Sequence, residues 1–317
     1  MSANPIAADR RLFRIQQEAA RLGFLACGVA KAERLTDEAR RLENWLSTGH
    51  HGQLAYMERH FDLRIDPAAL LPGARTVLTT LTNYWPRTTP TASLVAPKIS
   101  RYALGIDYHH VIRDRLQRLL AFIQAEVGSC AARICVDSAP FMDKAWAVRC
   151  SLGWVGKNTN LLRPGVGSWF FIGSLVLDVD LSAPTLRAAD RCGTCTRCID
   201  ACPTQALTPY HIDATRCISY WTIETANDPP PELAANFDGW AFGCDICQEV
   251  CPWNRFRIGH TEPLFELMHE VAELHTSESA FLTTSQYSKR LRRSPLSRIR
   301  REKWLRNRQL GLATHSG

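Results

Sequence analysis

Eight of the twelve cysteines lie in the short segment from Cys192 to Cys251, in two runs that each end in Cys-Pro. The first run has the spacing C-x-x-C-x-x-C-x-x-x-C-P, whereas the second begins with a lone cysteine and ends with C-x-x-C-x-x-x-C-P. Two-residue spacers let a tight turn wrap three thiolates around one face of a cubane cluster. The spacing therefore predicts two 4Fe–4S clusters in a bacterial-ferredoxin-like segment, and a protein that moves single electrons.

In two-cluster ferredoxins the cysteine before the proline crosses over to the other cluster. The expected ligands of cluster one are Cys192, Cys195, Cys198 and Cys251, and those of cluster two are Cys202, Cys217, Cys244 and Cys247. The second run departs from the usual pattern, because Cys217 lies 27 residues before Cys244. This departure lengthens one ligand loop and leaves the number of ligands unchanged.

Zinc is the alternative metal, because sites with four cysteines also use two-residue spacers. The unbroken first run favours clusters, since zinc ribbons pair two cysteines and then leave a long gap. The other four cysteines, Cys27, Cys130, Cys135 and Cys150, are scattered among apolar neighbours. We expect them to be small buried residues of the core.

The composition is ordinary for a soluble globular protein of 317 residues, with 45% hydrophobic and 22% charged residues. No apolar stretch approaches the roughly 18 residues of a membrane span. The first five residues, MSANP, lack the basic-then-apolar layout of a signal peptide. We expect a cytoplasmic monomer that makes no contact with a membrane.

Apolar periodicity predicts helices over residues 9–22, 37–46, 107–126 and 142–151, and strands over 76–84, 133–136, 160–162 and 169–177. A turn at Arg163-Pro164-Gly165 predicts that the last two strands form a hairpin, and residues 86–97 suggest a loop. Mixed helices and strands indicate an α+β or α/β domain over 1–185. The cluster module then covers 186–258, and a helical, basic segment covers 259–317.

Positive charge is concentrated near the C-terminus. Residues 288–308 contain ten Lys or Arg and one acid, Glu302, a local charge of +9, so the rest of the chain sums to −2 within the total of +7. Such density suggests a polyanionic partner bound through its phosphates, and the alternative is a solvated helix face. A helix over 295–308 places basic residues on all sides, with little to gain from packing.

Several motifs together resemble the epoxyqueuosine reductase family, from about Gly23 to Arg308. The segment DSAPFMDK at 137–144, followed by RCSLGWVGKNT at 149–159, resembles the cobalamin-binding core of these enzymes. Further similar stretches are Arg64-x-x-Pro67-x-x-Leu70-Leu71-Pro72, Ser100-Arg101-Tyr102-Ala103-x-Gly105-x-Asp107-Tyr108-His109, Cys217-Ile218-Ser219-Tyr220 and Ser294-Pro295-Leu296-x-Arg298-x-x-Arg301-x-x-x-Leu305-Arg306-Asn307.

The resemblance implies a cobalamin-dependent iron–sulfur enzyme that reduces the epoxide of epoxyqueuosine, at the tRNA wobble position, to queuosine. It implies an N-terminal α/β cobalamin-binding domain like that of reductive dehalogenases. The implied partners are a tRNA anticodon stem-loop and an external electron donor such as a flavodoxin or a ferredoxin. Two other functions stay open: a reductive dehalogenase-like enzyme, and a non-catalytic iron–sulfur electron-transfer protein.

Removing an epoxide oxygen as water takes two electrons and two protons, so a proton donor is needed. The resemblance implies Asp137 for this role, and burial against the corrin is expected to raise its pKa. The alternative is that Asp137 caps the following helix, together with Ser138 and Pro140. His50, His51, His109 and His110 are expected to be structural or surface residues, which leaves cobalt without a protein ligand.

The resemblance also implies the cofactor contacts. They are Arg64, Ser100, Asp137, Ala139, Pro140, Phe141, Met142, Asp143, Lys144, Asn158, Leu161, Ile172, Ser219, Cys244 and Asp245. A helix N-terminus near residues 139–144 offers free N–H donors to the corrin side chains. Cys244 and Asp245 are expected to bring cluster two next to the corrin, so that electrons hop a short distance to cobalt.

Overall fold

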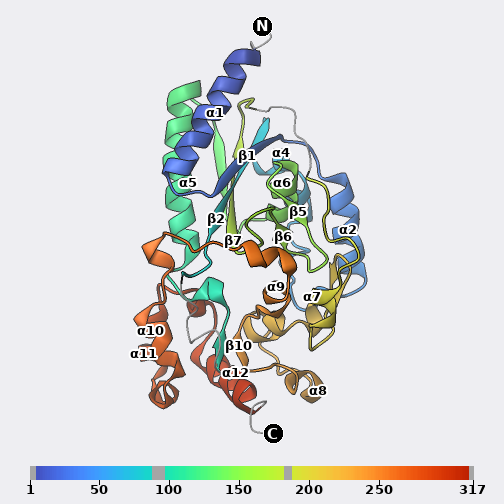
Figure 1. Cartoon of the computed structure of the whole chain (residues 1–317), viewed down its shortest axis with the longest axis vertical. Helices are drawn as coiled ribbons and strands as arrows, with labels where there is room; N and C mark the ends of the chain where they lie inside the picture. Colours follow the sequence, from blue (N-terminus) through green and yellow to red (C-terminus); the bar gives the residue numbers. More distant parts are fainter. Residues whose placement is uncertain (1–4, 88–96, 182–187, 314–317) are drawn as a thin grey trace.

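A four-stranded sheet is the centre of the computed structural model, which describes residues 5–87, 97–181 and 188–313 (Figure 1). Its strand order is β1-β2-β7-β4, and every neighbouring pair is antiparallel. The strands are β1 (Ala26–Lys31), β2 (Thr76–Asn83), β7 (Phe170–Leu177) and β4 (Ala132–Cys135). An antiparallel sheet covered by helices makes the fold α+β, which is one of the two fold classes that the sequence left open.

Two helices cover each face of the sheet. Helices α1 (Pro5–Arg21) and α5 (Tyr108–Val127) pack on one face, and α2 (Thr36–Ser47) and α6 (Asp143–Arg149) pack on the other. Helix α5 has buried apolar residues at helical spacing, among them Ile112, Leu116, Leu119 and Ile123. The expected helices at 9–22, 37–46, 107–126 and 142–151 are confirmed, because each stripe of apolar side chains has a sheet face to cover.

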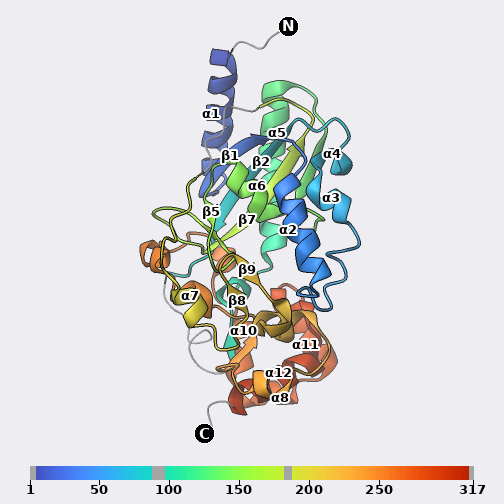
Figure 2. The same ribbon diagram turned by 90° about the vertical axis from the view of Figure 1, so that its right-hand side faces the viewer.

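The cysteine-rich segment lies between the sheet and the C-terminal helices, as both views show (Figures 1 and 2). Its elements are α7 (Arg197–Asp200), β8 (Leu207–Thr208), β9 (His211–Ile212), η3 (Ala214–Arg216), the π-helix η4 (Tyr220–Glu224), α8 (Pro231–Ala234), β10 (Trp240–Phe242), α9 (Ile246–Glu249) and η5 (Pro252–Phe256). One strand pairing ties it to the N-terminal part of the chain, because β10 pairs in parallel with β3 (Lys98–Ile99).

Short elements complete the chain. Those before the cysteine-rich segment are α3 (Phe61–Ile65), α4 (Pro67–Leu70), η2 (Arg101–Ala103), β5 (Trp154–Val155) and β6 (Leu161–Leu162). Those after it are η6 (Pro263–Phe265), α10 (His269–Ala272), η7 (Glu273–His275), η8 (Ser277–Phe281), α11 (Thr284–Leu291), η9 (Pro295–Arg298) and α12 (Arg301–Ala313). Within the described residues, no helix is both long enough and apolar enough to span a membrane.

The strands differ from the expected ones in two places. The predicted turn at residues 163–165 is present, because Arg163 and Gly167 form an antiparallel bridge across it. The predicted pairing of the two strands is wrong, because β6 pairs with β5 while β7 lies between β2 and β4 in the central sheet. Strand β1 was not expected, since its small residues ACGVAK carry a weak strand signal. Its Gly28 is required by packing, because a Cβ there would lie 2.1 Å from the carbonyl oxygen of Cys150 at the end of α6. Most of the expected loop at 86–97 falls on residues 88–96, outside the described residues.

The basic C-terminal segment is not a solvated helix. It bends from the 3₁₀-helix η9 into α12, and it buries Leu296, Ile299 and Trp304 in a core shared with β3 and β10. The expectation of one helix over 295–308 with little to gain from packing is therefore wrong. Apolar side chains between the basic ones supply this packing.

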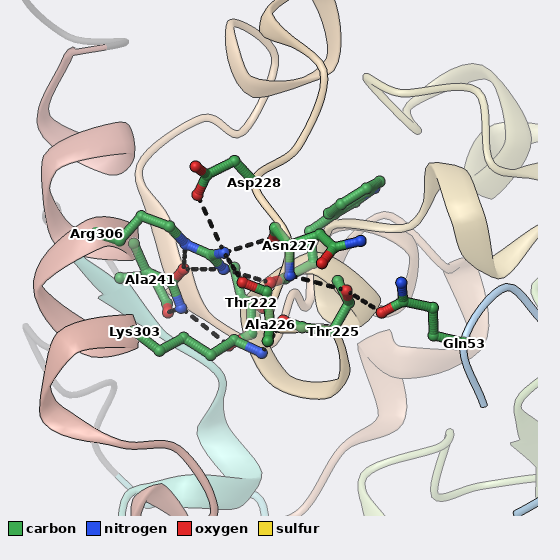
Figure 3. Close-up of polar contacts among 11 residues, drawn as sticks. Gln53, Thr222, Thr225, Ala226, Asn227, Asp228, Ala241, Lys303 and Arg306 are labelled. Carbon is green, nitrogen blue, oxygen red and sulfur yellow. Dashed lines mark hydrogen bonds and ion pairs between the residues drawn. The ribbon is translucent and has the colours of Figure 1, made fainter. Parts of the chain in front are cut away.

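Several of the basic side chains bind backbone carbonyls (Figure 3). The Arg306 guanidinium donates to the carbonyl oxygens of Trp221, Ala226 and Asn227, at 2.9, 3.3 and 2.6 Å. The Lys303 ammonium donates to the Thr225 carbonyl, and burial lowers the pKa of Lys303 to about 8. These cations hold α12 against the loop that follows η4, so they are part of the structure of the chain.

Candidate active site

Asp137 occupies a strained turn just after β4. Its φ angle is +45°, in the left-handed region that costs an ordinary residue about 1–2 kcal/mol. Helix α6 begins six residues later, and its N-cap is Met142, so Asp137 does not cap it. The helix-cap alternative is therefore wrong. Strain of this kind persists where surrounding contacts hold the residue in place, and it concentrates at functional sites.

Three side chains from two other parts of the chain surround the Asp137 carboxylate. The Tyr108 hydroxyl donates a hydrogen bond of 2.8 Å to its Oδ2, and His109 Nε2 lies 3.4 Å from the same oxygen. The Arg298 guanidinium, at the end of η9, approaches to 3.9 Å. The Asp137 side chain is nevertheless 50% exposed, so the carboxylate is accessible to a substrate.

The neighbours of Asp137 set its charge state. Burial alone raises its pKa, but hydrogen bonds from His109 and Tyr108 and the positive charges of His109 and Arg298 outweigh burial and lower the pKa below its ordinary value. Asp137 is therefore ionised at neutral pH. The expected rise of this pKa depends on burial against the corrin and stays a prediction.

His109 carries the proton instead. Burial works against its charged form, but hydrogen bonds to Asp107 and Asp137 outweigh burial and raise its pKa to about 9. Asp107 is the N-cap of α5, and its Oδ1 accepts hydrogen bonds both from the His109 N–H and from its ring Nδ1, at 3.0 and 2.7 Å. The histidine was expected to be structural, yet it contacts the candidate catalytic group. Its place in the Asp107-Tyr108-His109 motif was the available signal.

Arg298 is a second residue of the site that the sequence did not single out. Its guanidinium lies 3.1 Å from Glu224, at the end of η4, as well as 3.9 Å from Asp137. The surrounding carboxylates outweigh burial and raise its pKa, so it stays charged. One cation thus links the C-terminal segment, the cluster module and the strained turn.

Arg64 and Asp143 present polar atoms without protein partners. Arg64 donates to the Tyr56 carbonyl at 2.9 Å, but its buried Nε has no hydrogen-bond partner among the described residues. The same is true of the buried Asp143 Oδ1, and burial raises the pKa of Asp143 to about 8. Unpaired buried polar atoms are rare in folded proteins. Both residues are expected cofactor contacts, and a large group with amide side chains would satisfy these atoms.

Ser100 and Asp245 contact each other. The Ser100 hydroxyl donates to Asp245 Oδ1, and the Arg101 backbone N–H and guanidinium donate to Oδ2 at 2.9 and 3.1 Å. All three residues are buried, and burial is the main reason why the pKa of Asp245 is raised. This network holds the loop that carries Cys244 against η2, so the two sequence motifs form one unit.

Most of the other expected contacts line the sheet face that carries α6. Ala139, Phe141, Met142, Leu161 and Ile172 belong to, or pack against, the same core cluster, and Phe141 and Leu161 are buried in it. Pro140 beside them is half-buried. Lys144 donates to the Thr159 carbonyl at 2.8 Å, and Asn158 donates to the Cys247 carbonyl at 3.1 Å. Segment 137–160 therefore lies between the sheet and cluster two.

The eight cysteines of the two runs lie close together in the fold. Burial and the nearby thiolates of Cys251, Cys192 and Cys195 raise the pKa of Cys198. In the second set, burial and the thiolates of Cys247 and Cys217 raise the pKa of Cys244, and Cys202 and Cys217 act likewise on Cys247. Cys198, from the first set, also raises the pKa of Cys247, so the two sets lie close together. The crossed pairing, in which Cys202 and Cys251 each join the other run, stays a prediction.

Backbone N–H groups point at several of these sulfurs. Ala206 donates to Cys202 Sγ at 3.3 Å, and the N–H groups of Ser219 and Tyr220 lower the pKa of Cys217 against the larger effect of its burial. Such bonds tune the potential of a cluster. Among the described residues, no three His, Cys, Asp or Glu side chains are placed to hold a single metal ion.

Two family models match the chain. The model described as epoxyqueuosine reductase QueG, DUF1730, matches residues 64–138, and the 4Fe-4S double cluster binding domain matches residues 191–254. The first match contains Arg64, Ser100 and Asp137, and the second contains all eight cysteines of the two runs. The chain accordingly carries two 4Fe–4S clusters, and the division of the eight cysteines between them stays a prediction.

Known proteins resemble nearly the whole chain. An epoxyqueuosine reductase of Cellulophaga algicola is 47% identical over 287 residues, which are 90% of this chain and 93% of that protein. One of Leadbetterella byssophila is 52% identical over 251 residues, 79% of this chain and 82% of that protein. The crystal structure of an epoxyqueuosine reductase with an epoxyqueuosine-modified tRNA-Tyr stem loop matches with a TM-score of 0.86 and 26% identity, over 97% of this chain and 82% of that one. The chain belongs to the epoxyqueuosine reductase family and is an oxidoreductase of that family.

Proposed function

We propose that this protein reduces the epoxide of epoxyqueuosine in tRNA to the alkene of queuosine. Both C–O bonds of the epoxide break, a C=C bond forms, and the oxygen leaves as water after taking up two electrons and two protons. The observation that carries the proposal is the Asp137 carboxylate, exposed by half and paired with a protonated His109, on the segment that packs against cluster two.

Cobalamin is the cofactor that suits this site, and the fit rests on this chain's own residues. Arg64 Nε and Asp143 Oδ1 are buried polar atoms that need partners, and both lie close enough to Asp137 to share its electrostatic field. When bound, cobalamin supplies a cobalt centre that gathers electrons from the clusters. Arg64, Ser100, residues 139–144, Asn158, Leu161, Ile172, Ser219, Cys244 and Asp245 are the proposed contacts.

Asp137 and His109 together supply the proton. At neutral pH the pair holds one transferable proton, which resides on His109 while the carboxylate is ionised. A substrate that covers the half-exposed carboxylate removes water from it, and loss of water favours the neutral acid. Asp137 then takes the proton from His109 and delivers it to the epoxide oxygen, and the second proton that completes the water molecule comes from solvent. An epoxyqueuosine reductase of Bacillus subtilis, 25% identical with a TM-score of 0.84, is described with its catalytic aspartate loop swung out of the active site.

tRNA is the proposed macromolecular partner. The wobble base must be splayed out of its loop to reach the site, so the neighbouring phosphates lie on the surface around it. Arg292, Arg293 and Arg300 are exposed there, and none of them has an ion-pair partner among the described residues. The Arg293 carbonyl accepts a hydrogen bond of 2.7 Å from Asp107 N–H, which places this cationic rim beside the start of α5.

Anaerobically reconstituted full-length protein tests the proposal directly. It is incubated with cobalamin, a low-potential reductant and an anticodon stem-loop that carries epoxyqueuosine, and the nucleosides are analysed by mass spectrometry. The expected product has lost one oxygen atom, and omission of cobalamin abolishes its formation. Protein that holds both reduced clusters and cobalamin but leaves the epoxide intact would overturn the proposal.

A further inference from the structure

The site of cluster one is open at the surface of the protein. Its four expected ligands, Cys192, Cys195, Cys198 and Cys251, line a cavity of about 220 Å³, which is the space that the cluster would fill. The chain around them is exposed, including Arg191, Gly193, Thr194, Thr196 and Arg197. Cluster two lies on the inner side, where Asn158 and Asn160 contact Cys247, at its carbonyl and sulfur respectively. Electrons from outside therefore reach cluster one first.

The rim of this cavity is cationic. Among the described residues that line it, Lys157, Arg191 and Arg255 are cations and none is a carboxylate. Lys157 is held by the ligand loop itself, because its Nζ donates to the carbonyls of Gly193 and Cys195 at 2.7 and 3.0 Å. Asp190 lies nearby, but its carboxylate accepts hydrogen bonds from the Tyr210 hydroxyl and the Cys192 N–H.

Exposed apolar side chains alternate with these cations. Phe256 is 41% exposed and Ile258 is 51% exposed, and they alternate with the exposed Arg255 and Arg257. The Arg255 guanidinium lies 4.5 Å from the centre of the Phe256 ring, and Trp253 lies next to that ring at 6.3 Å. An exposed ring with a cation over it suits a protein partner, because apolar contact adds to the attraction between charges.

We propose that this rim is the docking surface for an acidic one-electron carrier protein. The inference rests on the proposed function only in that the reaction consumes two electrons. Each encounter oxidises the carrier by one electron and reduces cluster one by one electron, so two encounters supply one epoxide. Opposite charges speed such encounters by about 10–10³-fold at low ionic strength, and small transient interfaces are typical of electron transfer.

Stopped-flow reduction of the clusters tests the docking surface without any tRNA, so its result does not depend on the proposed substrate. The probe is reduced flavodoxin, a strongly acidic carrier, mixed with the reconstituted holoprotein at low and high salt. The parent protein is compared with Arg255→Glu and with Arg191→Glu/Arg255→Glu. Arg133→Glu, which reverses an exposed charge on β4, is the matched control. Photoreduced deazariboflavin, a small neutral reductant, reports whether the clusters themselves remain intact.

We expect the double variant to lower the second-order rate constant with flavodoxin at least about tenfold at low salt, with a smaller loss at high salt because ions screen the charges. The rate with deazariboflavin and the rate of the control variant stay at the parent level. An unchanged flavodoxin rate overturns the proposal. An equal loss with both reductants also overturns it, because that result would make the arginines structural.

Discussion

The His109 imidazole lies 3.4 Å from the Asp137 carboxylate, Nε2 to Oδ2, and Asp107 holds its other ring nitrogen at 2.7 Å. A histidine between two carboxylates keeps its proton to unusually high pH. Asp137 alone cannot hold a proton at neutral pH, because the same contacts that orient it also favour its ionised form. The proposed catalytic acid is therefore a pair of residues, and the pair has its own pH dependence.

His109→Gln should change the alkaline side of the pH profile. The pKa of His109 is about 9, so parent turnover should decline as the pH rises through that value and the shared proton is lost. The variant lacks this group, and we expect turnover about 10²-fold lower at neutral pH, without a decline near pH 9. Turnover of the stem-loop from pH 6 to pH 10 is the measurement. A variant with the parent profile would show that His109 is not the proton source.

The same substitution should alter stability in a defined pH window. The folded pKa of His109, about 9, exceeds the ordinary value of 6.5. Its ion pairs therefore stabilise the protein fully below about pH 6.5, and this contribution disappears as the pH rises through about 9. The unfolding free energies of parent and His109→Gln should thus converge on going from pH 6 to pH 10. A difference that stays constant over this range would mean that the histidine stabilises the fold by packing alone.

Asp137→Asn should lower turnover without affecting the binding of the clusters and cobalamin. The amide keeps the shape of the side chain but cannot pass on a proton, so we expect turnover to fall by about 10²–10⁴-fold. Both clusters and bound cobalamin should remain, as judged by their visible spectra. Asp114→Asn, at an exposed position on α5, is the control. Near-parent turnover by the Asp137 variant would remove it from the mechanism.

Two classes of basic residue in the C-terminal segment should behave differently. Reversing Arg292, Arg293 and Arg300 to Glu should weaken binding of the tRNA stem-loop and flatten its salt dependence, because fewer counterions are released. Thermal unfolding of this triple variant should match the parent, since these side chains are exposed. Binding is measured by fluorescence anisotropy over a salt series. If the triple variant binds tRNA with parent affinity, these arginines are not phosphate contacts.

Arg306→Ala should destabilise the fold. The substitution leaves the Trp221, Ala226 and Asn227 carbonyls without their donor, and an unsatisfied polar group costs about 1–3 kcal/mol where it is buried. We expect a lower unfolding midpoint, and Arg300→Ala, at an exposed position, should leave the midpoint unchanged. Equal midpoints for Arg306→Ala and the parent would contradict the structural role that Figure 3 indicates.

Metal analysis tests the ligand sets. Protein reconstituted without oxygen should contain about eight iron atoms per chain, as expected for two cubanes. Cys198→Ser should remove the electron paramagnetic resonance signal of cluster one first, whereas Cys27→Ser should leave both signals intact. Zinc in place of iron in protein kept free of oxygen would show that the assignment to clusters is wrong.

The sequence by itself determined the parts that local spacing controls. The two-cluster module and the helices with a continuous apolar stripe were predictable, whereas the crossed assignment of the cysteines stays a prediction. Cysteines at two- and three-residue spacings can bind one compact cluster. The buried face of a helix is visible in the sequence, because its apolar residues recur with the helical period. The resemblance to family motifs identified Asp137 and Arg64 as candidate site residues, but it could not give their protonation states.

Tertiary structure decided what depends on contacts between distant residues. Asp137 is ionised because His109 and Arg298, from α5 and η9, converge on it, and no local pattern encodes that meeting. The basic tail is similar: Lys303 and Arg306 bind carbonyls near η4, while Arg292, Arg293 and Arg300 stay exposed. The sequence gives the number of charged residues but not their contacts. Whether a cation binds the protein itself or remains free for a phosphate depends on which acceptors the fold brings within hydrogen-bonding distance.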